Sequence, residues 1–553
     1  MPLKKPESKI EAEIFEVWKQ WKPSAAYMGG VADCAGKLFV PTEEDIGKLL
    51  KRIKALKKQA EDVVQQKYLR CIETTIGFEE PYMAVDDALW TFFAHLVKEG
   101  VKTRNMLSLT NDTAEALKVS KKRLAKKKWS TEIRIVTCNE CNGLIGILET
   151  IKNEAKDAKL KSSIDKLVKT VEDYRKTFYV EGIKEGDFSE IFPILEKHGG
   201  NIGRKHVYPK ILRDMYDYPE TTDEIEAKGL RWLKEELPHL KEVTAALAKI
   251  YGIEPTIEKV SAEITKRRNV DKAKVVKFIT DAREILRKVV EKHLVKITPK
   301  YGTRVMETPS YLVNFISTAA MNNFDILTDK PFNVFFVTTD PKRAPPSGAP
   351  DLLQTLVHEE YGHCVNFSNS SVGFAAKPRL VELLDTRLHL PISDGISFYR
   401  EYEFLMLLKK LRAAKGLSGA EKDFMGLLRS MGNLDQVILE NEFVLTTWRI
   451  IRFLRAIGDV RINMHKQTIV EFVNWASKET DLSKKMIFNQ IFIFQDRPGY
   501  APCYSIAGDA LRKIQETAAK KGKSIVDFNT YACSLGFPPR TIFEQKLNRF
   551  AKA

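Results

Sequence analysis

The chain has 553 residues, of which 44% are hydrophobic, and its 89 Lys+Arg against 73 Asp+Glu give a net charge of +16. This composition is typical of a soluble globular protein. It excludes a disordered chain, which would be short of apolar residues, and a collagen, which needs far more than the 29 glycines present. The N-terminus lacks the apolar segment of a signal peptide, and no apolar run is long enough to span a bilayer, so we expect a cytoplasmic protein.

Most of the chain carries apolar residues at helical spacing with charges between them, as in the segments 48–64 and 225–247. Thr221 and Glu224 form the pattern of a capping box before the second segment. In contrast, FNVFFVTT at 332–339 is a β-branched and aromatic run, which predicts a strand. The sequence therefore predicts a mainly α fold with a small β element.

The Gly-rich stretch KHGGNIGRKH at 197–206 indicates a boundary between two regions. We place an N-terminal helical region at 1–205 and a catalytic helical domain at 206–553. Within the second region, Pro350 and Asp351 predict the start of a new helix, because proline is tolerated in a first helical turn and a carboxylate favours the positive helix end.

The motif HEEYGH at 358–363 lies in that helix and is close to the HExxH zinc signature, with one extra residue between the histidines. In a regular helix, residues five apart lie about 140° apart around the axis and could not share a metal. A π-type bulge would absorb the extra residue, and Gly362 is the residue best able to adopt the distorted backbone. The motif therefore predicts a zinc site with a bulge, with His358 and His363 as ligands.

In such a site Glu359 would act as the general base toward water that the metal activates. The alternative is a helix face on which these charged residues are merely solvated. The apolar flanks of the motif disfavour it, since a buried His-Glu pair without a metal would be costly. We expect Glu360 to lie at the surface or behind the site.

A third protein ligand is expected downstream, where ISDGISFYRE at 392–401 offers two carboxylates seven residues apart. Two helical turns place Asp394 and Glu401 on one face of a helix. Either carboxylate could complete the site. Asp394 would require a closer approach of the two helices, because its side chain is short.

Three blocks, HEEYGH, DGISFYRE at 394–401 and PGYAPCYSIAG at 498–508, occur in an order that resembles the "domain of unknown function 885" family. The similarity begins near residue 218. These are helical relatives of the gluzincin metallopeptidases, and the motifs here lack a proline in the first block and have Asp for Glu in the second.

The resemblance implies one Zn²⁺ per chain and places Asp394 where the family has its ligating Glu. Glu401 would then orient a histidine, or ligate the metal if Asp394 does not. Tyr504 would donate a hydrogen bond to the developing oxyanion, with Tyr500 as a second candidate that contacts substrate. The strand at 332–339 would be the edge strand beside the zinc helix, holding an extended peptide by main-chain hydrogen bonds.

The expected function is therefore hydrolysis of short peptides, as an exopeptidase or oligopeptidase, with no membrane partner. The rival is a non-catalytic binding protein with a degenerate metal site, whose basic stretch KKRLAKKK at 121–128 recruits nucleic acid or a protein partner. Few aromatic residues interleave that stretch, so nucleic acid is the less favoured partner. The sequence does not fix the oligomeric state.

Overall fold

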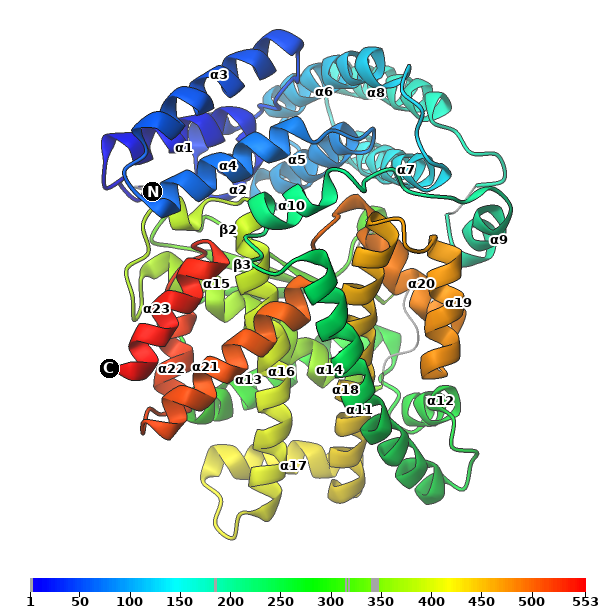
Figure 1. The fold of residues 1–553 in the computed structure, drawn as a ribbon, viewed down its shortest axis with the longest axis vertical. Helices are drawn as coiled ribbons and strands as arrows, with labels where there is room; N and C mark the ends of the chain where they lie inside the picture. Colours follow the sequence, from blue (N-terminus) through cyan, green and yellow to red (C-terminus); the bar gives the residue numbers. More distant parts are fainter. Residues whose placement is uncertain (1–2, 184–185, 314–315, 317–318, 340–347) are drawn as a thin grey trace.

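Helices make up most of the computed structural model of the protein, which describes residues 3–183, 186–313, 316, 319–339 and 348–553 (Figure 1). The N-terminal helices α1 to α8 lie together at one end of the molecule, above the remaining elements in the view of Figure 1. The helices of this first part are α1 (Lys9–Trp21), α2 (Pro23–Met28), α3 (Glu43–Gln59), α4 (Val63–Gly77), α5 (Met83–Glu99), α6 (Thr103–Leu124), α7 (Thr131–Glu154), α8 (Ala158–Thr177) and α9 (Phe188–His198).

The rest of the chain contains the long helices and the three strands. Its helices are α10 (Tyr208–Met215), α11 (Thr222–Tyr251), α12 (Ile257–Arg267), α13 (Val275–His293), α14 (Ala349–Leu356), α15 (Val365–Val372), α16 (Leu390–Ala413), α17 (Gly419–Met431), α18 (Leu434–Asn463), α19 (Ile469–Thr480), α20 (Lys484–Phe492), α21 (Gly508–Lys520), α22 (Ile525–Ala532) and α23 (Arg540–Lys552). Helices α11 and α18 pack along each other. The predicted mainly α fold with a small β element is confirmed.

Local sequence signals explain where two key helices begin. Thr221 caps α11 by accepting from the backbone of Glu224, whose side chain reaches back to the backbone of Thr221, so the predicted capping box is present. Pro350 and Asp351 lie in the first turn of α14, as expected. In the described part of the chain no helix is both long enough and apolar enough to cross a membrane.

The small sheet has the strand order β1 (Thr303–Glu307), β3 (Phe332–Val337), β2 (Ala319–Phe324). β3 runs parallel to β1 and antiparallel to β2, with Val334 opposite Arg304 and Asn322. The predicted strand therefore forms, but it is the central strand and not the edge strand. β2 is the edge strand that packs against the helix carrying the HEEYGH motif.

Burial on both faces explains why β3 is central. Val334 and Phe336 point into a core shared with α5 to α8, where Phe336 contacts the ring of Phe93 at a centroid distance of 5.6 Å. Phe335 and Val337 point into the other core cluster, which joins residues of α1 to α4 with those of the second part. A strand buried on both faces is nearly continuously apolar. FNVFFV has this pattern apart from Asn333, whose buried amide donates to Oγ of Ser368 at 2.9 Å. The division of the chain at 205/206 stays a prediction.

A buried ion pair attaches the C-terminal helix α23 to the start of α11. Glu220 accepts hydrogen bonds from Arg540 at 2.7 and 3.0 Å and from Lys228 at 2.8 Å. Burial alone would raise the pKa of Glu220, but the two cations outweigh it and lower the pKa to about 2. The carboxylate therefore stabilises the folded state above its ordinary pKa, and this contribution is lost as the pH falls toward 2.

We expect Glu220→Gln to lower the free energy of unfolding at pH 7 by about 3 kcal/mol. The difference between the two proteins should narrow as the pH falls from 7 to 3, because the wild-type carboxylate becomes protonated. Urea unfolding at several pH values measures this. An equal difference at every pH would show that the charge of Glu220 contributes nothing.

Candidate metal centre

The HEEYGH motif lies in a π-helical segment, η4 (Val357–Cys364), inserted between α14 and α15. The three segments form one helical run from 349 to 372, so the bulge predicted from the spacing of His358 and His363 is confirmed. The wider turn places the two imidazole rings together, with centroids 4.9 Å apart. The extra residue between the histidines is thereby accommodated.

Gly362 has a second role that the sequence did not reveal. A Cβ atom at this position would lie 2.6 Å from the Cα of Ser397 and 2.3 Å from its Oγ. The absence of a side chain therefore allows η4 and α16 to approach closely. Gly395 makes a comparable approach on another side of α16, where an added Cβ would lie 2.7 Å from the Cβ of Ala507.

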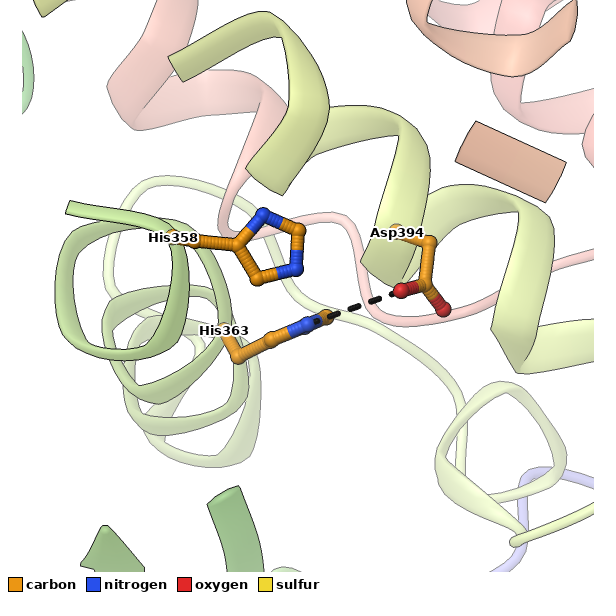
Figure 2. Close-up of side chains that lie close together, drawn as sticks. All are labelled: His358, His363 and Asp394. Atoms are coloured by element: carbon orange, nitrogen blue, oxygen red, sulfur yellow. Dashed lines mark ion pairs between the residues drawn. The ribbon is translucent and has the colours of Figure 1, made fainter. Parts of the chain in front are cut away.

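This close approach brings Asp394 to the two histidines. Figure 2 shows the three side chains converging, His358 and His363 from η4 and Asp394 from α16. One potential ligand atom from each residue lies within 4.8 Å of the others, and Nε2 of His363 is 3.6 Å from Oδ1 of Asp394. All three residues are buried. Two imidazoles and one carboxylate are a donor set that fits zinc and leaves a position for water or substrate.

The opposite ring nitrogens of both histidines are already engaged. Nδ1 of His358 donates to the carboxylate oxygen Oε1 of Glu401 at 2.7 Å, and Nδ1 of His363 forms a hydrogen bond with the hydroxyl of Ser393 at 2.7 Å. These bonds fix the ring orientations and leave Nε2 of each histidine to hold a metal. Glu401 also accepts from Arg452 at 2.6 and 2.9 Å. Glu401 thus lies behind His358 and outside the cluster, and Asp394 is the carboxylate among the three.

Glu359 follows His358 directly and is buried, with 8% of its surface exposed. Burial raises the pKa of Glu359 to about 7. The negative charge of Asp394 adds to this rise, and the charge of His358 opposes it. A carboxylate with a pKa near neutrality can both accept and return a proton. Burial also raises the pKa of Asp394, while it lowers the pKa of His363 and so favours the neutral imidazole that metals bind.

Glu360 is not at the surface, which was one of the two places expected for it. It is 1% exposed and accepts hydrogen bonds from Arg283 at 2.7 to 3.0 Å and from the hydroxyl of Tyr301 at 2.9 Å. This buried ion pair attaches η4 to α13. The two neighbouring carboxylates of the motif therefore have different surroundings: Glu360 is held in an ion pair, whereas the charges of His358 and Asp394 act on Glu359.

Tyr504 lies on a second π-helical segment, η8 (Cys503–Ala507), which packs on α16. Its ring is nearly parallel to that of His358 at a centroid distance of 6.1 Å, and its hydroxyl donates to that of Tyr500 at 3.1 Å. Burial raises the pKa of both phenols, so both are protonated donors at neutral pH. The structure thus places both predicted tyrosines beside the cluster.

Sequence reasoning missed two arginines of α18, Arg452 and Arg455. Both guanidinium carbons lie near the ring of Tyr504, at 5.5 and 5.1 Å from its centroid. Arg449, Arg452 and Arg455 recur at intervals of three in an otherwise apolar stretch. Charged residues repeated on one face of an apolar helix are the pattern that could have identified them. No recognised motif surrounds them.

The basic stretch at 121–128 has structural partners. Lys121 pairs with Asp173 at 2.6 Å, and Arg123 bonds Glu79. Both basic residues lie in the last turn of α6, where positive charge complements the helix end.

Two solved structures share the fold along nearly the whole chain. The crystal structure of "the putative lipoprotein from Colwellia psychrerythraea" matches with a TM-score of 0.66 at 12% identity, covering 99% of each chain. That of "a putative lipoprotein of unknown function from Shewanella oneidensis" matches with a TM-score of 0.65 at 16% identity, covering 97% of this chain and 98% of that chain. No protein-family model matches the chain, and no curated protein matches it significantly. At these identities the likeness shows the fold alone.

The resemblance to the domain of unknown function 885 family, and with it to the gluzincins, was wrong. No family model matches any part of the chain, and the structures that share its fold are described as lipoproteins. Three short blocks of sequence carried the resemblance. Such blocks describe a local arrangement of side chains, which can recur without common family membership. The functional argument therefore depends on the geometry of the cluster.

Proposed function

We propose that the protein is a zinc-dependent hydrolase of peptide bonds, with one Zn²⁺ per chain. The observation that carries this proposal is the cluster of His358, His363 and Asp394 with the buried carboxylate of Glu359 beside it. Bound zinc would supply Lewis-acid activation of water and of the substrate carbonyl.

The residues of the chain would supply the proton transfers and the positioning. Glu359 accepts a proton from the attacking water and then passes it to the leaving amine as the C–N bond breaks. Tyr504, whose hydroxyl donates to Tyr500 in the absence of substrate, turns this hydrogen bond to the carbonyl oxygen as that oxygen gains negative charge, and Tyr500 lies beside it for contact with substrate. Glu401 and Arg452 hold the His358 ring in place.

Burial of the site favours short peptides as substrates. His358, Glu359, His363 and Tyr504 each expose only 7 to 8% of their surface, so a folded protein chain could not reach them. An exopeptidase or oligopeptidase activity follows. The edge strand β2 packs against η4 and pairs with β3 alone among the described strands, so its other edge could hold an extended peptide.

For the compartment, we propose the cytoplasm, because all seven cysteines are free and buried. The two structural neighbours are described as lipoproteins, which would place such proteins at a membrane. Fractionation of the source cells distinguishes the two settings.

Metal content tests the proposal directly. We expect about one zinc per chain in the wild type and none in His358→Ala, His363→Ala or Asp394→Ala, because each removes one of three ligands. Glu401→Gln should keep its zinc with an affinity about 10 to 100 times lower, since it only orients His358. Elemental analysis after dialysis against graded chelator measures both effects.

Cleavage of a mixed library of short peptides completes this experiment. Chelator-sensitive cleavage that zinc restores would support the hydrolase. If the purified protein neither binds zinc nor cleaves peptides after zinc is added, the proposal fails. Steeply salt-dependent binding to nucleic acid would then favour the rival binding protein.

A further inference from the structure

Arg455 is a buried cation beside the metal centre, and no carboxylate of the described residues forms an ion pair with it. It exposes 8% of its surface. Its guanidinium lies 4.6 Å from the ring centroid of Phe494 and 5.1 Å from that of Tyr504, and it donates to the side-chain oxygen of Gln490. Its Nε is buried without a hydrogen-bond partner in the described part of the chain.

Other buried arginines of this protein are paired. Arg452, one turn earlier on α18, bonds both carboxylate oxygens of Glu401. Arg204 pairs with Glu80, and Arg540 with Glu220. A buried charge without a counter-charge is costly, so its retention requires an explanation. Burial lowers the pKa of Arg455, whereas the carboxylates outweigh burial and raise that of Arg204 and Arg540.

Arg455 lies close to Tyr504, one of the groups proposed to act on the substrate. The ring centroid of Tyr504 lies 6.1 Å from that of His358 and 5.1 Å from the guanidinium carbon of Arg455. The charge of Asp394 also acts on Arg455. A peptide that is bound at the metal centre and extends past Tyr504 would therefore approach Arg455.

We propose that Arg455 binds a carboxylate of the peptide substrate. This inference deepens the proposed function and depends on it for the identity of the substrate as a peptide. A guanidinium can bond both oxygens of a carboxylate, and Arg455 has donors to offer that its Gln490 contact does not use. The carboxylate is either the free C-terminus, which would make the enzyme a carboxypeptidase, or an acidic side chain.

Binding of three acetylated tripeptides tests the proposal in the zinc-loaded Glu359→Gln protein, where cleavage does not interfere. The first is trialanine with a free C-terminus, the second its C-terminal amide, and the third an amide with Glu as its last residue. Calorimetry gives each dissociation constant. We expect amidation of trialanine to raise the dissociation constant at least tenfold. The Glu amide should bind as tightly as free trialanine only if the site also binds an acidic side chain.

Adding Arg455→Met should abolish the preference for the carboxylate, and Arg455→Lys should reduce it, because lysine keeps the charge without the two-pronged geometry. Arg461→Met is the matched control on the same helix. Arg461 pairs with Glu226 and contacts the Trp475 ring, so its loss should leave the preference unchanged. Thermal midpoints show whether each variant folds.

Two results overturn the inference. One is equal or absent binding of all three peptides with Arg455 intact, and the other is a preference that survives Arg455→Met in a folded protein. Either result is compatible with the proposed hydrolase if the active enzyme cleaves peptides with a free C-terminus and the corresponding amides at equal rates. Conversely, if the protein binds carboxylate peptides selectively but cleaves none of them, the proposed hydrolase is refuted, while the carboxylate site at Arg455 is supported.

Discussion

Glu359→Gln should lower the rate of peptide cleavage by about 10³-fold, the size expected for loss of a general base, while zinc content and thermal midpoint stay unchanged. The amide has the shape of the carboxylate but cannot accept a proton from water. Because Glu359 is next to the ligand His358 but outside the cluster, its replacement should not remove the metal. Initial rates on a cleaved library peptide, per bound zinc, measure the effect.

Glu360→Gln is the matched control at the adjacent position. It breaks the buried pair with Arg283, so it should destabilise the fold by about 1 to 3 kcal/mol. The rate per bound zinc should stay close to that of the wild type. If Glu359→Gln kept more than a tenth of the wild-type rate, Glu359 would not be the general base.

Gly362→Ala should destabilise the protein by about 1 to 3 kcal/mol and weaken zinc binding about tenfold or more. The added Cβ would lie 2.6 Å from the Cα of Ser397, which is backbone and cannot rotate away. α16 would have to move, and Asp394 lies on it three residues before Ser397. Urea unfolding of the metal-free protein and zinc titration against a chelator measure the two effects separately.

Gly426→Ala provides the control, because Gly426 lies inside α17 with nothing within 4 Å of an added Cβ. Alanine favours helix over glycine by about 1 kcal/mol, so this variant should be as stable as the wild type or more stable. Unchanged zinc affinity in Gly362→Ala would contradict the role assigned to the close helix contact.

The sequence predicted the local features of the site because they depend on spacing within one helix. The five-residue interval between His358 and His363 required a bulge, and η4 is π-helical. Spacing alone did not decide between Asp394 and Glu401, because both were placed on one helix face, and Asp394 was favoured only through the family resemblance. The distance between η4 and α16 decides it, and the contact between Gly362 and Ser397 that sets this distance joins segments far apart in the chain.

Features that depend on tertiary contacts were missed or misplaced. Arg452 and Arg455 belong to a helix about ninety residues beyond the motif, and only the folded chain brings them to Tyr504. The strand β3 was predicted correctly, but its central place depends on β1 and β2, whose sequences TRVME and AAMNNF lack a clear alternating pattern. Strand order is a property of the sheet and is not encoded in one strand.

The extra residue in η4 is absorbed where it occurs, so the helix beyond it keeps the rotational setting of the helix before it. A π-type turn holds one residue more than an α turn, and deleting one residue to restore HExxH would therefore leave α15 facing the same way relative to α14. Asn369, Ser370 and Ser371 of α15 would keep their bonds to the main chain at Lys296, Cys533 and Ile326. The two motif lengths thus differ by one local insertion, and a mutational path between them need not disturb the attachment of α15.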